Sequence, residues 1–506
     1  MTRHSQHDRP AALLAVLTAL VLVLGGSLAG AVPAQAATTK PLTVSLTFDD
    51  GDADQMTAAQ VLAQNGLTGT FYIVTGYLGA PGYMQRSDLA TLAAAGNEIG
   101  GHTVTHPDMV PLSAAEATRQ ACQARATLSS WGHQVRSFAY PFASVNQRAQ
   151  AAVRDCGYTS GRGLGDVKSV TGCADCVTSE TLPPRNALLT KAPDQVERSW
   201  TLADLQNQVT QAKSRGGWVQ LTFHHISDDP ALDPAVSPAL FAQFAQWLSA
   251  YAAVPANATS VRNVGDVIGT PVQSVVQAPT PAPAGPGVNG VQNPSFQTTS
   301  TTSPSGLKCW QYGGYGANTP TFGTVVPGRV GTNTRAATLS VSGYQDGDAK
   351  WLPTFDLGDC APTVVPGHTY SLREYYRSDT VTQFTVYLRD TDGAWHYWTS
   401  SPWFAAASTW TQAAWTTDAI PSGSTGISFG LNLFTDGSLT TDDAALYDSV
   451  GAPALTTATT TNTATLARRT AATLTRIAPR VPAPAARLTA AVGQDDPAGV
   501  AGDLAH

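Results

Sequence analysis

The sequence predicts an α/β domain followed by an all-β sandwich, and the order of its composition changes supports this fold class. Between residues 41 and 268, short apolar β-rich runs alternate with helical patterns, which predicts a parallel sheet with βα crossovers, either a barrel or a doubly wound sheet. Residues 271–287 hold little besides Pro, Ala, Gly, Val and Gln, as expected of a linker. From 288 to 453, short Thr-, Tyr- and Trp-rich runs separated by turn residues predict an antiparallel sandwich. The Thr/Ala/Pro/Arg-biased residues 454–506 are predicted to form a disordered, low-complexity tail.

The elements of the first domain are expected from apolar periodicity and from signals at their ends. Ser113 with Glu116 forms a capping-box pattern at the start of one helix, and Ser87 is expected to cap another. Glycines follow the ends of several helical patterns, where a left-handed residue commonly stops a helix. The expected strands are 43–48, 69–74, 98–101, 137–142 and 218–223. The expected helices are 58–65, 88–95, 114–131, 146–156 and 238–251.

The N-terminus has the pattern of a secretory signal peptide. Two arginines precede an apolar run at 11–24, and Ala34-Gln35-Ala36 offers the small residues that a signal peptidase needs. A membrane anchor is the alternative, but the run is short for a span and no stop-transfer charges follow it. Cleavage after Ala36 would make 1–36 the signal peptide and 37–270 the first mature domain. We therefore predict a secreted, extracellular protein with no membrane attachment after cleavage.

The six cysteines suit an exported protein, because an even number in an oxidising compartment predicts disulfides. The two in the sandwich are expected to pair with each other, whereas the four in the first domain allow three connectivities. Cys173-Ala174-Asp175-Cys176 could suggest zinc, but it provides only two of the four ligands of a structural site. The favoured pairings are Cys122 with Cys156, Cys173 with Cys176, and Cys309 with Cys360.

The charge balance narrows the choice of partners. The chain has 29 Lys and Arg against 36 Asp and Glu, a formal net charge of -7. A nucleic-acid binder would usually show a basic face, so nucleic acid is not an expected partner. A neutral glycan fits this charge better than an anionic polymer does.

Two pairs of polar residues follow predicted strands, at the edge where active sites of parallel α/β folds assemble. Asp49 and Asp50 follow the first strand, and such a pair is useful if one carboxylate binds a cation while the other remains a base. An ordinary polar turn is the alternative. His102 and His106 follow the third strand and can offer two imidazole ligands, although such pairs also occur on exposed helices. With Asp50 they would form a three-ligand metal site open to water and substrate.

Two adjacent histidines close the last clear strand of the first domain. His224 continues the alternation of 218–223 more naturally than His225 does, and it could act as a proton donor. A shift of one residue would exchange the two roles. The alternative is that both are structural polar groups at a strand end.

Together these motifs resemble the polysaccharide deacetylases, the NodB-homology group of carbohydrate esterase family four. The resemblance covers about 42–268 and rests on Thr-Phe-Asp-Asp followed by His-Thr-x-x-His. It implies a distorted (β/α) barrel that removes acetyl groups from N- or O-acetylated sugars. It also implies Asp49 as the base, a divalent metal, most often zinc, and His224 as the acid. The metal ligands that it implies are Asp50, His102 and His106.

The sequence departs from this family pattern in two places. Tyr140 stands where many members have an arginine, which would leave Asp49 without its usual orienting partner. Arg185 resembles the arginine of family branches with this tyrosine, and Arg162 is the weaker candidate. The backbone N–H of Phe142 is expected to face the developing oxyanion, a role that needs no particular side chain. Members of this family usually have a further motif that contains an aspartate and a tryptophan, and we find no convincing counterpart of it in this sequence.

The sandwich contains seven of the eleven tryptophans. Flat sugar faces pack against aromatic rings, so exposed tryptophans would suit glycan binding, but we expect at least half of the seven to be buried. Asn293-Pro294-Ser295-Phe296 and Thr441-Asp442-Asp443 resemble the edges of jelly-roll carbohydrate-binding modules. A module for cell-wall adhesion or stability is the alternative.

These observations predict a secreted, metal-dependent hydrolase that removes acetyl from an acetylated polysaccharide, with Asp49 as base, a metal-activated water and His224 as acid. One alternative is a hydrolase of another amide or ester on the same scaffold. Another is a non-catalytic glycan-binding protein. The polymer, the N- or O-linkage, the metal and the oligomeric state stay open at this point.

Overall fold

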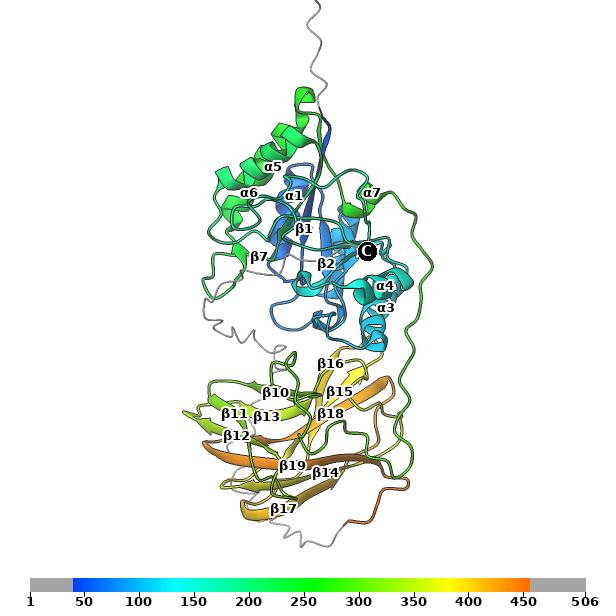
Figure 1. Ribbon diagram of the computed structural model, residues 1–506, viewed down its shortest axis with the longest axis vertical. Helices are drawn as coiled ribbons and strands as arrows, with labels where there is room; N and C mark the ends of the chain where they lie inside the picture. Colours follow the sequence, from blue (N-terminus) through cyan, green and yellow to red (C-terminus); the bar gives the residue numbers. More distant parts are fainter. Residues whose placement is uncertain (1–39, 456–506) are drawn as a thin grey trace, which may run out of the picture. The chain divides into compact units, whose positions relative to one another are not determined.

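The computed structural model describes residues 40–455, and the predicted signal peptide and nearly all of the predicted tail lie outside the described residues. The N-terminal domain is organised around a parallel sheet (Figure 1). Its strands are β1 (Leu42–Phe48), β2 (Thr70–Ile73), β3 (Glu98–Gly101), β4 (Ser137–Ala139), β5 (Ser160–Arg162), β6 (Gly217–Phe223) and β9 (Thr259–Val261). The strand order is β5-β4-β3-β2-β1-β6, and β9 shares one edge of β1 with β2.

The sheet is an open, distorted barrel, as the resemblance implied. Its two edge strands, β5 and β6, do not pair with each other. The irregular segment between them instead forms single bridges, from Thr190 to Arg162 and from Glu180 to Trp218. The gap in the barrel is therefore bridged by loop backbone, which satisfies part of each exposed strand edge.

Helices alternate with these strands, as the periodicity predicted. They are α1 (Gln55–Gln64), α2 (Arg86–Ala94), α3 (Ala114–Ser130), α4 (Gln147–Asp155), α5 (Leu202–Arg215), α6 (Pro238–Ala253) and α7 (Val264–Ile268). The Ser113 hydroxyl accepts the Glu116 N–H at 3.0 Å, so the predicted cap of α3 is confirmed. The cap of α2 is Gln85 rather than Ser87, since the helix begins earlier than expected. Two short strands, β7 (His225–Ile226) and β8 (Ala235–Val236), form a separate pair.

An aromatic cluster lies beneath the carboxyl end of β1. Phe48 is fully buried, and its ring centroid is 4.5 Å from that of Phe71 on β2 and 5.5 Å from that of Phe223 on β6. Such pairs add stability beyond the area they bury. The cluster anchors the last residue of β1, and thereby the position of Asp49, which follows it.

All three predicted disulfide pairings are confirmed. Cys122 on α3 is bonded to Cys156 at the end of α4, and Cys173 is bonded to Cys176. Cys309 and Cys360 are bonded within the sandwich. Each disulfide therefore joins two residues of the same domain.

The C-terminal region is an antiparallel sandwich of two five-stranded sheets (Figure 1). Its strands are β10 (Trp310–Tyr315), β11 (Thr319–Val325), β12 (Ala336–Ser342), β13 (Asp348–Pro353), β14 (Tyr370–Ser378), β15 (Phe384–Asp390), β16 (Trp395–Ser400), β17 (Ala407–Thr416), β18 (Ser424–Leu433) and β19 (Gly437–Asp448). One sheet has the order β10-β13-β18-β15-β16 and the other β11-β12-β19-β14-β17. Of its seven tryptophans only Trp310 and Trp351 are buried, so the expectation that at least half are buried was wrong.

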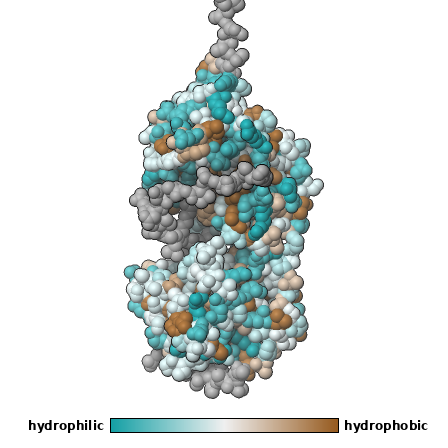
Figure 2. Space-filling view, in the orientation of Figure 1, coloured by the Kyte–Doolittle hydropathy of each residue, from teal (hydrophilic) through white to brown (hydrophobic). Residues whose placement is uncertain are grey.

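The face of the molecule shown in Figure 2 is mainly hydrophilic, with apolar residues in small separate groups. Within residues 40–455, no helix has the length and apolar character needed to cross a bilayer. The boundaries of the linker and of the two domains stay predictions.

Candidate active site

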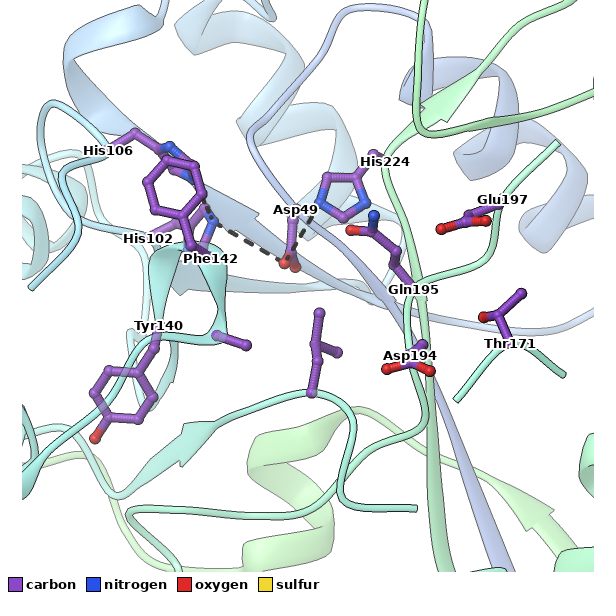
Figure 3. A pocket seen from close by; sticks show the side chains of 12 residues that line it. Asp49, His102, His106, Tyr140, Phe142, Thr171, Asp194, Gln195, Glu197 and His224 are labelled. Atoms are coloured by element: carbon purple, nitrogen blue, oxygen red, sulfur yellow. Dashed lines mark hydrogen bonds and ion pairs between the residues drawn. The ribbon is translucent and has the colours of Figure 1, made fainter. Parts of the chain in front are cut away.

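The carboxyl ends of β1, β3 and β6 carry polar residues to one edge of the sheet, where they line a cavity of about 680 Å³. Asp49 follows β1, His102 follows β3 and His224 follows β6. His106 and Phe142 lie on the same side of the cavity as His102, and Asp49 lies between them and His224 (Figure 3). The structure thus brings together most residues that the sequence analysis singled out.

Asp50, His102 and His106 form a candidate metal centre, with their ligand atoms within 4.8 Å of one another. The Asp50 Oδ1 lies 3.4 Å from His102 Nε2 and 3.2 Å from His106 Nε2. The His102 Nδ1 lies 2.8 Å from the carbonyl oxygen of Ala139, and it must donate there because a carbonyl only accepts. This contact leaves His102 Nε2 free to coordinate, as in many histidine metal sites. Two imidazoles and a carboxylate therefore fit a divalent cation with open positions.

A left-handed turn, rather than a helical one, brings the two histidines together. Thr103 has φ 66° and His106 has φ 56°. Gln120 on α3 holds this turn, because its Oε1 accepts the N–H groups of Val104 and Thr105, both at 3.1 Å. The Thr103 hydroxyl accepts the His106 N–H at 3.0 Å. These bonds hold strained backbone in place, as is common at functional sites.

Asp49 forms a buried ion pair with Arg162, the last residue of β5. One guanidinium nitrogen lies 2.6 and 2.5 Å from the two carboxylate oxygens, and both side chains are almost fully buried. Burial alone would raise the pKa of Asp49, but the charges of Arg162, His102 and His224 outweigh it and lower that pKa. The Asp49 Oδ2 is also 4.0 Å from the Nε2 atoms of both His102 and His224. Asp49 is therefore ionised near neutral pH, as a base must be.

The pairing corrects the expectation for Arg185. That side chain is exposed on the segment between β5 and β6 and does not line the cavity. Arg162, the weaker candidate from the sequence, forms the ion pair with Asp49 instead, because β5 pairs with β4 so that Arg162 lies beside Ala139. Tyr140, in the place of the family arginine, donates its hydroxyl to Leu188 O at 2.8 Å. The positive charge beside Asp49 thus comes from the Arg162 side chain on β5, and not from a side chain at position 140 after β4.

The protonation of the candidate metal ligands follows from their contacts. Burial alone would raise the pKa of Asp50, but hydrogen bonding to His102 and the nearby imidazole charges hold it well below its usual range. Burial alone would lower the pKa of His102, yet Asp50 and Asp49 raise it. In the absence of a cation, His102 therefore holds its proton more firmly than a free imidazole, and a bound cation would displace that proton.

The two histidines after β6 point to different partners. His224 lines the cavity, whereas the Nδ1 of His225 lies 2.9 Å from Asp54 Oδ2 and outside the lining residues. The buried Gln55, the first residue of α1, donates its amide to the carbonyl oxygens of Asp49, at 2.5 Å, and His224, at 3.2 Å. The sequence analysis missed Gln55, because nothing local marks a glutamine at a helix start as bridging two strand ends.

The far side of the cavity was also missed. Leu164, Thr171, Asp194, Gln195 and Glu197 also line the cavity. Of these, Thr171, Asp194, Gln195 and Glu197 lie on the side opposite His102 and His106 (Figure 3). They belong to the long irregular segment between β5 and α5, which has no periodicity from which their direction could be read. The only local feature that could have marked this wall is the pair of carboxylates Asp194 and Glu197, three residues apart.

The fold and the cluster define an α/β half-barrel domain with a candidate metal centre at the carboxyl edge of its sheet. Residues 36–161 match the family model described as polysaccharide deacetylase. A chitin deacetylase from a Pestalotiopsis species is 34% identical over 124 residues, which is 24% of this chain and 41% of that protein. This chain thus spans about two fifths of the length of that relative.

Two solved structures are similar at low identity. An acetyl xylan esterase of family 4 from Clostridium thermocellum, with a cobalt ion, is 16% identical, with 46% of this chain and 93% of that chain covered and a TM-score of 0.31. A family 4 carbohydrate esterase from Streptomyces lividans, in complex with acetate, is 18% identical, with 42% and 89% covered and a TM-score of 0.29. At these scores the likeness carries no argument about function. The family match ends before Arg162 and His224, so their placement rests on the geometry alone.

Proposed function

We propose that this protein is an exported, metal-dependent hydrolase that removes acetyl groups from an N- or O-acetylated polysaccharide. The observation that carries the proposal is the position of Asp49, a buried and ionised carboxylate between a three-ligand cluster and His224 in one cavity. The family match over residues 36–161 supports the same activity. The three disulfides support export, because such bonds persist in oxidising compartments.

The residues divide the chemistry as follows. A divalent cation held by Asp50, His102 and His106 would supply Lewis acidity, polarising the acetyl carbonyl and lowering the pKa of water. Asp49 accepts the proton of the attacking water, and Arg162 keeps this carboxylate ionised and oriented.

Charge then develops on the carbonyl oxygen of the acetyl group. The backbone N–H of Phe142 donates to this oxygen as the water oxygen bonds to the carbonyl carbon. His224 donates a proton to the departing sugar nitrogen or oxygen as its bond to that carbon breaks. The products are acetate and the free amine or alcohol.

A screen for acetate release tests the proposal. The full-length mature protein, loaded with zinc, is incubated with chitin oligosaccharides, acetylated xylan, peptidoglycan and an acetylated exopolysaccharide, with and without a chelator. We expect acetate from at least one polymer, and its loss on chelation. Chelator-resistant release would contradict the metal dependence. Release from none of the polymers, by a protein shown to be folded and to contain metal, would contradict the activity.

We further propose that the sandwich binds the glycan. Three tryptophans of the sandwich remain partly exposed and are not among the side chains of its hydrophobic core. They are Trp395 on β16, Trp403 in the segment before β17, and Trp410 on β17. Partly exposed rings of this kind can pack on sugar faces. The expected result is that residues 37–270 alone hydrolyse soluble oligosaccharides but are retained less on insoluble polymer than residues 37–453. Equal retention of both proteins on every insoluble glycan tested would rule out this role.

A further inference from the structure

The side chain of Phe142 is the most exposed aromatic ring beside the cavity, with 66% of its surface accessible. Its backbone has φ 58° and ψ 14°, a left-handed conformation that disfavours a residue with a large side chain. A glycine would offer the same backbone N–H at this φ without strain and without exposing apolar surface. The proposed oxyanion role therefore leaves the phenyl ring unexplained.

The ring is held in a defined place next to the candidate metal centre. Its centroid lies 4.7 Å from that of the His106 ring, with an angle of 64° between the planes. This edge-to-face contact is a favoured aromatic geometry, so it orients the phenyl ring at the wall of the cavity. The exposed part of Phe142 thus borders the space where an acetyl group would react (Figure 3).

The opposite wall of the cavity is polar. Asp194, Gln195 and Glu197 line it, and the Ser169 hydroxyl donates to Asp194 at 2.7 Å, which orients that carboxylate. The volume of about 680 Å³ lies within the usual range for small-molecule sites and leaves room for more than an acetyl group. One wall therefore offers a flat apolar ring and the other offers hydrogen-bonding groups. A pyranose has matching surfaces, a flat C–H face and a rim of hydroxyls.

We propose that the phenyl ring of Phe142 forms the subsite for the pyranose unit that carries the reacting acetyl group. The C–H face of the sugar packs on this ring, and its hydroxyl rim is directed to Asp194, Gln195 and Glu197. The inference rests on the proposed function and deepens it. It makes Phe142 a specificity-determining residue that favours sugar-borne acetyl groups over small acetyl esters.

The test compares two substrates in the full-length, metal-loaded enzyme. One is an acetylated oligosaccharide that the enzyme hydrolyses, and the other is a small alkyl acetate, which has neither a sugar ring nor an aromatic ring to pack on Phe142. The variants are Phe142→Leu, which keeps apolar bulk, Phe142→Ala, which removes the ring, and Phe142→Tyr, which keeps it. We expect kcat/KM on the oligosaccharide to fall about tenfold more than on the alkyl acetate for the first two, mainly through KM, and to be largely retained for Phe142→Tyr.

Two controls make the outcome decisive. Val254→Ala changes an exposed apolar residue that does not line the cavity, and metal content with thermal unfolding verifies that each variant is folded. Equal losses on both substrates, or an oligosaccharide kcat/KM that survives Phe142→Ala, would overturn the subsite. Either result would leave the proposed function intact, because wild-type acetate release would persist. If the wild-type enzyme releases acetate only from the alkyl acetate, both the function and the subsite fail.

Discussion

Asp49 and Asp50 are neighbours in the chain, but their side chains make different contacts. Asp49 is paired with Arg162, whereas Asp50 contacts His102 and His106. The left-handed backbone of Asp50, with φ 75°, turns its carboxylate toward the histidines. Two neighbouring carboxylates therefore meet different partners, as the proposed roles of Asp49 as base and Asp50 as metal ligand require.

Substitution of the two aspartates is expected to have different effects. Asp50→Ala should lower metal content, and excess cation should restore part of the activity. Asp49→Asn should keep the metal but lower kcat by about 10²- to 10⁴-fold, the usual contribution of a positioned acid–base group, and added cation should not restore it. The measurement is metal content beside acetate release. The division is wrong if Asp49→Asn loses metal as completely as Asp50→Ala.

Arg162 is expected to set the pH range in which Asp49 can act. Its charge lowers the pKa of Asp49, so Arg162→Met should raise that pKa and protonate the base in mildly acidic solution. The acidic limb of the kcat/KM profile should then move to higher pH. The matched control is Arg185→Met, since Arg185 is exposed and does not line the cavity. A shift with Arg185→Met and none with Arg162→Met would restore the role predicted for Arg185.

At the scale of the elements, the candidate active site depends on hydrogen bonds that join the ends of neighbouring strands. Gln55 joins the end of β1 to the end of β6 through the carbonyl oxygens of Asp49 and His224. Five non-glycine residues with positive φ lie at or beside the candidate site. They are Asp50, Thr103, His106, Phe142 and Ala143. The regular sheet therefore positions the strand ends that carry the candidate site, and the irregular backbone after each end sets the direction of the side chains.

Gln55→Met is expected to loosen the spacing between base and acid. The change removes both amide hydrogen bonds but keeps similar bulk, so kcat should fall by roughly 10- to 100-fold, with a smaller effect on KM and with metal content retained. Gln64→Met is the control, because Gln64 is an exposed glutamine at the other end of α1. Kinetics and metal analysis are compared in the two variants. A loss of metal in Gln55→Met would show a general disruption of the site instead.

The strand ends that carry Asp49, His102 and His224 could be predicted, because each follows a short apolar run whose end is marked in the local sequence. The α/β class, the sandwich and the disulfides were predicted on similar grounds and are confirmed. The partner of Asp49 could not be decided, since it depends on the register of β5 against β4. The wall containing Asp194 lies in a segment without periodicity, where side-chain direction depends on tertiary contacts alone.

At the scale of the whole molecule, a buried acid in the sandwich should make stability depend on pH. Burial raises the pKa of Glu374 on β14 from 4.5 to about 8. Between these values the folded protein keeps a proton that the unfolded chain releases, so the free energy of unfolding falls as pH rises. The loss above pH 8 is at most about 5 kcal/mol.

Glu374→Gln should remove the part of this dependence that Glu374 contributes, since the amide keeps the shape and cannot ionise. Burial also raises the pKa of Asp356 to about 7 and that of Asp442 to about 6, so a shallower slope should remain in the variant. Urea unfolding followed by tryptophan fluorescence from pH 5 to 9 measures it, because seven of the eleven tryptophans lie in the sandwich. Asp418→Asn, at an exposed position of the sandwich, is the control and should leave the slope unchanged. A slope in Glu374→Gln that equals the wild-type slope would assign the pH dependence to other groups.

Strand β1 pairs with β6 and β9, which come much later in the sequence, and this affects folding during synthesis. Thr47 on β1 bonds to Thr222 on β6, 175 residues later, and β9 follows later still. At usual translation rates, β1 waits about 10–35 s after it is made before this partner exists. Contacts of such high sequence separation slow folding and leave an apolar strand open to wrong partners. A nascent chain that ends before Gly217 should therefore be cut by protease within β1, and one that reaches Gly269 should resist; equal cleavage of the two would contradict late closure of the sheet.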